Sequence, residues 1–356
     1  MSTGFRAVQW NRHKLIYDAV LLAGVALFIA CFMVLAPRLW PGANDVTWDI
    51  LRIRAFGICA FVMLTVILAI GPLARLDRRF LPLLYNRRHF GVVTFCVAAL
   101  HAWYVLGWYH SDGELPMLVS LLVSNRHYMS FINFPFELLG LAALLVLFLM
   151  AATSHDYWLA FLTPPVWKAL HMAVYPAYGL LVLHVALGAM QTERSPIIPL
   201  LLGGAFAGVA ALHIIADRRE RGGRESRASD GWLAVGSPLS ISDGGARVVA
   251  VPGGERIAVF RDGSRIGALS NVCAHQNGPL GEGRLIDGCV TCPWHGFQYR
   301  LEDGCSPPPF TEKVATYRVR IRDGLVEVHP APLPLGSKAV LALIDAGTEG
   351  KANAAR

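Results

Sequence analysis

The sequence predicts a membrane all-α six-helix bundle followed by a small all-β domain, and three observations support this fold class. The chain of 356 residues is 54% hydrophobic and only 16% charged, whereas soluble domains carry about 25% charged residues. Long uncharged runs dominate up to about Ala216. From Trp232 onward, apolar and polar residues alternate in short runs broken by Gly and Pro, which is typical of strands.

Six segments are apolar and long enough to span a bilayer, which takes about 20 residues of helix. They cover roughly residues 15–36, 55–74, 89–109, 136–153, 168–191 and 196–216. The fifth contains Pro176, which a spanning helix tolerates when its neighbours satisfy the freed carbonyl. No cleavage site of the signal-peptide type follows the first segment, so we expect it to remain as a helix.

The distribution of positive charge predicts that both termini are cytoplasmic. With the N-terminus inside, 14 Lys and Arg residues fall in cytoplasmic segments and five in outer loops, which is the excess that orients membrane proteins. Topology therefore explains the net charge of +7, and we expect no nucleic acid as a partner. The expected setting is multi-pass insertion in a bacterial-type inner (plasma) membrane, in contact with membrane lipid.

The change in composition predicts the domain boundaries. Residues 1–216 are expected to form the membrane domain, and the charged segment 217–230 a linker. Four strand-like runs and several "DG" dipeptides, which favour hairpin turns, predict a β-domain over 231–330. Residues 331–356 are expected to form a flexible tail. The strand-like runs are "RVVAV", "RIAVF", "YRVRI" and "LVEVH".

The stretch "NVCAHQNGPLGEGRLIDGCVTCPWHGFQY" combines C-x-H with C-x-x-H on two loops of the predicted β-domain. The four candidate ligands are Cys273, His275, Cys292 and His295. A zinc ribbon usually repeats C-x-x-C, and a zinc finger places both histidines on one helix. A zinc site therefore fits the pattern poorly. The two loops resemble the Rieske [2Fe–2S] centre, in which two cysteines hold one iron and two histidines the other.

The resemblance to Rieske domains covers residues 231–330 and implies that Cys273 and Cys292 bind one iron, and His275 and His295 the other. A Rieske oxygenase would also need a mononuclear iron held by two histidines and a carboxylate. Only a short segment follows residue 330, so we do not expect an oxygenase. Two further thiols, Cys289 and Cys305, are expected to be bystanders.

Departures from the respiratory bc-complex type of Rieske protein bear on the potential. That type has an extra cysteine in each loop and a serine after the glycine of the second loop. Here those positions hold Gly278, Trp294 and Phe297. Because fewer hydrogen bonds to the cluster stabilise its reduced form less, the predicted potential is near the low end of the Rieske range, about −150 mV.

Histidines inside the apolar spans suggest a second site, because ionisable groups are costly at membrane depth. His101 lies in the third span, and His171 and His184 lie in the fifth. Those two are roughly 20 Å apart along a helix, with Pro176 between them as a source of a kink. His101 and His184 form a plausible axial pair, and His89 lies where a partner for His171 is needed. The alternatives are hydrogen bonding between helices and, for His89, a place at the membrane interface.

The segments "RRHFGVVTFCVAALHAWY" and "WKALHMAVYPAYGLLVLH" resemble the haem-bearing spans of the ferric reductase-like transmembrane superfamily. They are especially similar to the membrane haem subunit of bacterial periplasmic methionine sulfoxide reductase systems. The resemblance spans about residues 50–216 and implies b-type haems on His101, His171 and His184, and the spacing of His171 and His184 suits two haems at different depths. That subunit has an apolar residue in place of His89, so the fourth ligand stays open, with His110 in reserve.

Together these parts predict a transmembrane electron-transfer protein. A cytosolic reductase or ferredoxin would be the donor, and a periplasmic redox protein or quinone the acceptor. No G-x-G-x-x-G follows a strand, so we expect no dinucleotide site in the chain. The alternatives are a quinone-linked oxidoreductase and a haem or iron–sulfur redox sensor. Whether the chain is itself an oxidoreductase enzyme or an electron-transfer subunit stays open.

Overall fold

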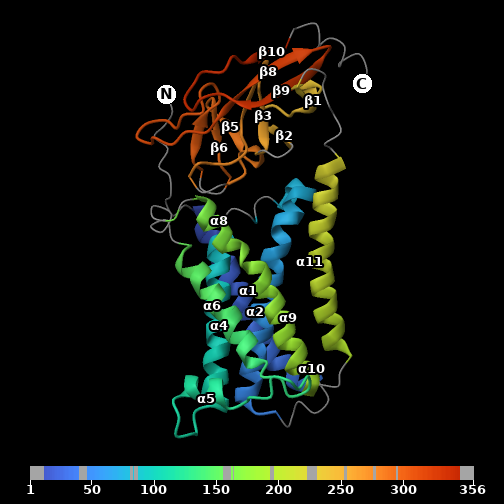
Figure 1. The fold of residues 1–356 in the computed structure, drawn as a ribbon, viewed down its shortest axis with the longest axis vertical. Coiled ribbons are helices and arrows are strands. Elements are labelled where there is room, and N and C mark those ends of the chain that lie inside the picture. Colours follow the sequence, from blue (N-terminus) through green and yellow to red (C-terminus); the bar gives the residue numbers. More distant parts are fainter. Residues whose placement is uncertain are drawn as a thin grey trace. The chain divides into compact units, whose positions relative to one another are not determined.

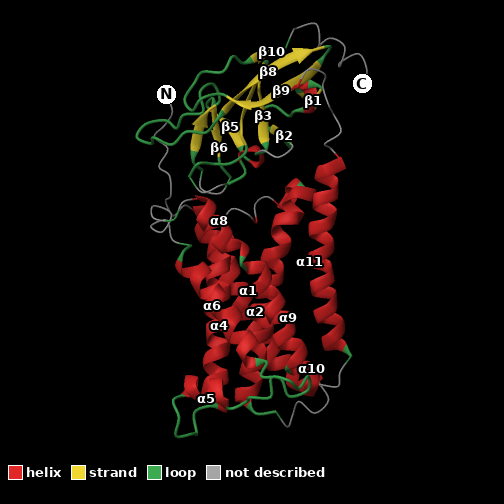
Figure 2. Cartoon of the chain, viewed as in Figure 1, coloured by secondary structure: helices red, strands yellow, loops and turns green. Residues whose placement is uncertain are grey.

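The computed structural model describes residues 12–39, 46–80, 83, 87–154, 162, 164–192, 196–222, 231–251, 255–275, 278–293 and 296–344. It divides into two compact units, of which one is Asn11–Ala216 and the other contains Asp217–Arg356. Helices form the first unit and strands dominate the second (Figure 2). The predicted fold class, a helical membrane domain followed by a β-domain, is confirmed.

Long helices run side by side in the first unit (Figure 1). Five described helices are long and apolar enough to cross a membrane, and a shorter apolar helix brings the set to the predicted six. The first four of these helices are α1 (Arg12–Leu39), α2 (Trp48–Leu76), α4 (Arg87–Tyr109) and the shorter α6 (Glu137–Ala152). The fifth span consists of α8 (Pro164–Met172), α9 (Val174–Leu187) and α10 (Ala189–Thr192), and the sixth is α11 (Ile197–Gly222). The short elements η2 (Arg78–Phe80) and α5 (Met117–Val123) lie between spans.

The fifth span is interrupted between Met172 and Val174. Pro176, one turn further on, has no N–H with which to bond the carbonyl of Met172. The helix therefore ends and restarts between His171 and His184. The break lies where Pro176 predicts a kink.

Helix packing arranges the bundle as two close pairs, because α2 packs on α4 and α6 packs on α9. A shared apolar cluster joins the pairs and includes Leu64 of α2, Leu147 of α6 and Tyr178 of α9. The Arg88 guanidinium at the start of α4 lies 5.6 Å from the ring centroid of Trp167 in α8. Further along, His101 of α4 meets His184 of α9. The third and fifth spans therefore run in the same direction.

The second unit contains two antiparallel sheets. The larger has the strand order β1-β9-β8-β4-β3-β2, with β10 also paired to β4, and the smaller has the order β5-β6-β7. The larger sheet consists of β1 (Leu233–Gly236), β2 (Ala246–Val249), β3 (Ile257–Asp262), β4 (Arg265–Ser270), β8 (Thr316–Arg322), β9 (Leu325–Pro332) and β10 (Ala342–Leu343). The smaller consists of β5 (Arg284–Ile286), β6 (Cys289–Thr291) and β7 (Gln298–Arg300).

Two of the "DG" dipeptides form the two-residue turns predicted from them. Asp287 and Gly288 join β5 to β6 with φ values of 50° and 74°. Asp323 and Gly324 join β8 to β9 with φ values of 50° and 75°. Positive φ at both positions is the type I′ geometry that matches strand twist and favours Asp-Gly.

The segment predicted to be a flexible tail is partly built into the β-domain. Strand β9 continues to Pro332, and Ala342–Leu343 pair with Ile266 and Arg265 of β4. Ile344 is buried in the core of the larger sheet. The apolar run "AVLALI" supplies this strand, and its partner is far away in sequence. Residues 345–356 lie outside the described part of the chain.

Candidate functional site

The two cysteines of the predicted cluster motif lie on loops that follow β4 and β6. Their residues are only 1% and 2% exposed, and Cys273 and Cys292 belong to one apolar cluster. The Cys273 N–H donates to the carbonyl of Gly278 (2.9 Å), and the Cys292 N–H donates to that of Phe297 (2.8 Å). Each loop is thus closed by its own cysteine, and Gly296 in the second loop has a φ of 72°.

His275 is the third predicted ligand that the structure places. Its ring stacks on Phe297, with centroids 4.8 Å apart and planes 9° from parallel. Its backbone N–H donates to the hydroxyl of Tyr299 (3.2 Å). The fourth predicted ligand, His295, lies outside the described residues. Three of the four predicted ligands therefore come from the two loops of one small domain.

Tyr299 is a residue of this site that the sequence reasoning missed. Its hydroxyl lies 3.3 Å from the Sγ atom of Cys273. Because that oxygen accepts the N–H of His275, its own hydrogen is free to point at the sulfur. Burial, followed by the charge of Cys273, raises the pKa of Tyr299, so the phenol keeps the proton that it donates. In the sequence, the signal that could have identified Tyr299 as part of the site is its position at the end of "CPWHGFQY".

The donor set fits a [2Fe–2S] group of the Rieske kind. Two buried thiols and an imidazole come from paired loops, and a phenol is placed to donate a hydrogen bond to one cysteine sulfur. Burial raises the pKa of the Cys289 thiol, which makes that thiol less reactive. The bystander role of Cys289 stays a prediction.

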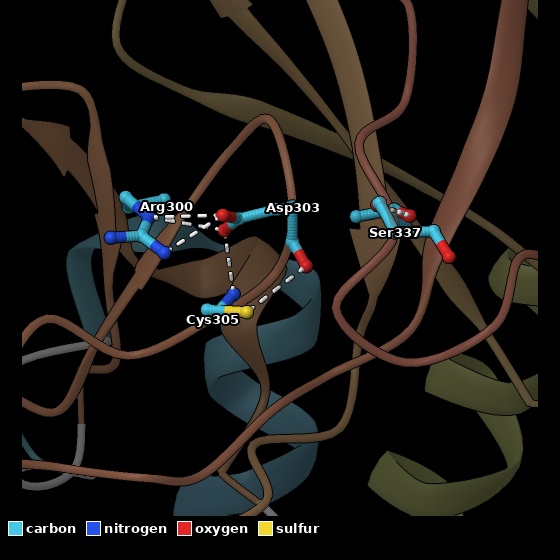
Figure 3. A network of polar contacts seen from close by, with 5 residues as sticks. Arg300, Asp303, Cys305 and Ser337 are labelled. Carbon is cyan, nitrogen blue, oxygen red and sulfur yellow. Dashed lines mark hydrogen bonds and ion pairs between the residues drawn. The ribbon is translucent and has the colours of Figure 1, made fainter.

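A polar turn closes the segment after β7, close to Tyr299 in the chain. The Arg300 guanidinium makes a two-pronged ion pair with Asp303, whose Oδ1 also accepts the N–H of Cys305 (2.9 Å), as Figure 3 shows. Burial alone would raise the pKa of Asp303, but Arg300 and the Cys305 N–H outweigh it and hold that pKa below its usual range. The Cys305 thiol donates to the carbonyl of Asp303 (3.7 Å). Cys305 therefore stabilises the turn through these two hydrogen bonds to Asp303.

The membrane unit brings together the two histidines predicted to pair. The ring centroids of His101 and His184 are 6.5 Å apart, and their planes are 82° apart. Nδ1 of His101 lies 2.9 Å from the carbonyl oxygen of Ile53, and Nδ1 of His184 lies 2.9 Å from that of Phe136. A carbonyl can only accept, so each Nδ1 carries the hydrogen and each Nε2 keeps its lone pair. A ring nitrogen of a neutral imidazole that keeps its lone pair can bind a metal ion.

His171 lies near the other end of the same span. Its ring stacks on Trp167, with centroids 3.8 Å apart, and its Nδ1 lies 3.0 Å from the Trp167 carbonyl oxygen. Its Nε2 is buried and has no hydrogen-bond partner among the residues that the structure describes. A buried polar atom without a partner is costly, whereas a metal bond would satisfy it.

His89 points toward the first helix. Its Nδ1 lies 2.7 Å from the Asp18 carboxylate, the arrangement in which a carboxylate fixes a metal-binding imidazole by its other nitrogen. The role of His89 as fourth ligand stays a prediction. The reserve candidate His110 lies 3.0 Å by its Nδ1 from the hydroxyl of Ser120.

His213 differs from the predicted haem ligands in the hydrogen bonding of its ring nitrogens. Its Nδ1 lies 2.9 Å from the carbonyl oxygen of Val209, and its Nε2 lies 3.0 Å from the hydroxyl of Tyr175. Both ring nitrogens are therefore occupied. This is the hydrogen-bonding role considered for the membrane histidines, and among them His213 fits it.

Comparison with known proteins identifies both parts of the chain. Residues 56–182 match the family described as "Ferric reductase like transmembrane component", and residues 231–318 match "Rieske [2Fe-2S] domain". The heme-binding subunit MsrQ of protein-methionine-sulfoxide reductase from Rhodospirillum rubrum is 30% identical over 210 residues, which are 57% of this chain and 93% of that protein. The chain belongs to the ferric reductase-like transmembrane family and carries a Rieske domain. This ferric reductase-like protein is thus an integral membrane protein of redox electron transfer.

The Rieske part has relatives among small ferredoxins. The ferredoxin subunit of anthranilate 1,2-dioxygenase from Burkholderia cepacia is 42% identical over 80 residues, which are 22% of this chain and 74% of that protein. Among solved structures, the Sphingomonas yanoikuyae B1 ferredoxin is 26% identical, with a TM-score of 0.26, over 28% of this chain and 98% of that one. The family match supports a [2Fe–2S] cluster in this ferric reductase-like protein.

Proposed function

We propose that the protein passes electrons across the membrane, between a Rieske cluster on the cytoplasmic side and two b-type haems, toward a periplasmic or membrane acceptor. A cytosolic reductase or ferredoxin is the proposed donor, and a periplasmic redox protein or quinone the proposed acceptor. The observation that supports this most directly is the His101–His184 pair, held inside the bundle of a chain that also carries Rieske loops.

His101 and His184 would hold one haem iron between them. At about 2 Å from metal to nitrogen and about 1 Å from nitrogen to ring centroid, two imidazoles that held one metal atom between them would have centroids about 6 Å apart. The observed separation is 6.5 Å. The carbonyls of Ile53 and Phe136 hold both rings in the tautomer that leaves Nε2 available. When bound, haem iron with two nitrogen ligands supplies one-electron chemistry at a tuned potential.

The second histidine site supports a relay through two depths of the membrane. His171 lies at the start of the fifth span, whereas His184 lies near its other end. Thirteen residues of helix correspond to roughly 20 Å. Because the charge distribution predicts cytoplasmic termini, the site of His171 would face the cytoplasmic side and the His101–His184 pair the outer side.

A second candidate is exchange of electrons with quinone, and an open depression lies at the predicted outer end. Its volume is about 540 Å³, and Phe136, Gly188, Gln191 and Asn133 are among its lining residues. Phe136 also provides the carbonyl that holds His184, so a ligand there would lie beside the outer histidine pair.

Purification of the full chain with metal analysis and a reduced-minus-oxidised spectrum tests the main proposal. We expect two haems and two irons of Rieske type per chain. Zinc in the β-domain, or no haem, would overturn it. Redox titration separates the two candidates: if the cluster titrates well above both haems and menaquinol alone reduces the protein, the cytosolic donor is wrong and the quinone-linked function holds.

A further inference from the structure

A glycine lies directly behind each imidazole of the His101–His184 pair. A Cβ built on Gly57 of α2 would lie 2.9 Å from both Nδ1 and Cε1 of His101. A Cβ on Gly140 of α6 would lie 2.9 Å from the same two atoms of His184. Favourable contacts between carbon atoms begin at about 3.5 Å. Even the smallest side chain at either position would therefore displace the ring.

The same arrangement occurs twice in the bundle. Each histidine bonds a carbonyl 48 residues earlier in the chain, Ile53 for His101 and Phe136 for His184. In both cases the glycine follows that carbonyl by one helical turn, so its N–H is the normal helical partner of the same oxygen. The Gly140 N–H lies 3.4 Å from the Phe136 oxygen, a long bond for an oxygen that the imidazole shares.

We propose that Gly57 and Gly140 are positioning residues for the outer haem ligands. By lacking a side chain, each glycine lets an imidazole close onto the helix carbonyl behind it. That contact fixes the hydrogen on Nδ1 and leaves the lone pair on Nε2. The proposal rests on the proposed function in one respect, that Nε2 of each histidine binds haem iron. The position of each ring is a property of the chain alone.

Substitution by alanine separates positioning from folding. Alanine in a helix is more favourable than glycine by about 1 kcal/mol, so neither α2 nor α6 is weakened. The atoms that the new methyl group would meet belong to a histidine side chain, which moves more readily than backbone. The expected result of Gly57→Ala or Gly140→Ala is a folded chain with a displaced ring.

Two glycines on the histidine helices provide matched controls. A Cβ on Gly91 of α4 or on Gly179 of α9 would meet no described atom within 4 Å. We would purify the full-length wild-type chain and the four single alanine variants. The ratio of haem absorbance to the Rieske electron paramagnetic resonance (EPR) signal would be measured, since the cluster of the same chain reports how much protein is folded.

We expect Gly57→Ala and Gly140→Ala to lose most of the outer haem relative to the Rieske signal, or to keep it with a changed low-spin EPR spectrum. Gly91→Ala and Gly179→Ala should match the wild type in both. If the first two variants also match the wild type, the positioning role is overturned.

A second measurement does not depend on haem. In dithionite-reduced protein labelled with ¹⁵N-histidine, nuclear magnetic resonance distinguishes Nδ1–H from Nε2–H. The wild type should show the Nδ1–H form for His101 and His184, assigned by loss of each signal in His101→Gln and His184→Gln. Gly57→Ala should alter the His101 signal alone, and unaltered signals would overturn the proposal. A wild-type chain without haem would overturn the proposed function, while this readout would still decide the role of the glycines.

Discussion

The imidazole planes of His101 and His184 stand 82° apart, close to perpendicular. Relative ring orientation sets the electronic asymmetry of a low-spin ferric haem with two imidazole ligands, and perpendicular rings give a highly anisotropic EPR signal. We therefore predict such a signal for the outer haem, rather than the rhombic signal of parallel rings. EPR of the oxidised full-length protein checks it, and a purely rhombic spectrum would contradict it.

Removal of one ring should abolish that signal. His101→Ala and His184→Ala are each expected to lose the outer haem, because only one of its two imidazole ligands would remain. His213→Ala is the matched control, since both nitrogens of His213 are occupied by Val209 and Tyr175. It should keep both haems. A loss of haem in His110→Ala with retention in His184→Ala would instead assign the ligand to the reserve candidate.

The inner site gives a prediction about its fourth ligand. If His89 binds the inner haem opposite His171, then His89→Ala and His171→Ala should each leave one haem per chain. Asp18→Asn should weaken the same haem, because loss of a carboxylate behind a metal-binding imidazole typically costs about 10- to 100-fold in metal affinity. Haem content after gel filtration measures this. Two haems in His89→Ala would show that another residue is the fourth ligand.

Spacing within single segments made much of the fold and of the candidate site predictable. The apolar spans, the depth of His101 and His184 and the C-x-H and C-x-x-H loops are all local patterns. The supporting groups are not local: the carbonyl of Ile53 lies 48 residues from His101. A backbone carbonyl leaves no trace in the identity of its residue, and a glycine that is needed for close approach looks like any other glycine in a helix.

The β-domain shows the same limit. Strand β10 has a short apolar pattern but pairs with β4, about 75 residues earlier in the chain, so composition alone made it a tail. Tyr299 was visible in the motif, yet its bond to Cys273 depends on the return of β7 toward the first loop. The prediction of a low potential from the missing serine therefore did not take into account this hydrogen bond to the sulfur of Cys273.

That hydrogen bond makes Tyr299 a determinant of the cluster potential. A donor to a cysteine sulfur stabilises the more negative, reduced form. Its removal in Tyr299→Phe should therefore lower the potential, by about 40 mV if the differential bond energy is about 1 kcal/mol. Redox titration followed by EPR measures the shift. Tyr317→Phe is the control, because Tyr317 is buried in the other core cluster of the domain. Equal potentials in wild type and Tyr299→Phe would exclude the role.

The turn held by Asp303 predicts an acid-sensitive contribution to the stability of the β-domain. Arg300 and the Cys305 N–H hold the pKa of Asp303 below its unfolded value, although burial opposes them. A carboxyl with a depressed folded pKa stabilises the fold above its unfolded pKa of about 3.9, and that stability is lost as pH falls through the folded value. Asp303→Asn should therefore destabilise the domain at pH 7, by about 1–3 kcal/mol for a buried group left without its charge partner. The difference from the wild type should shrink as pH falls below about 4.

Thermal bleaching of the cluster in the full-length protein, measured from pH 7 downward, follows this difference. Asp262→Asn is the control, because its ion pair with Arg265 lies on an exposed hairpin, where such pairs contribute about 0–1 kcal/mol. The control should bleach at nearly the wild-type temperature throughout. A gap between Asp303→Asn and the wild type that stays constant into acid would mean that the Asp303 side chain acts through shape rather than charge. The proton-linked contribution assigned to it would then be wrong.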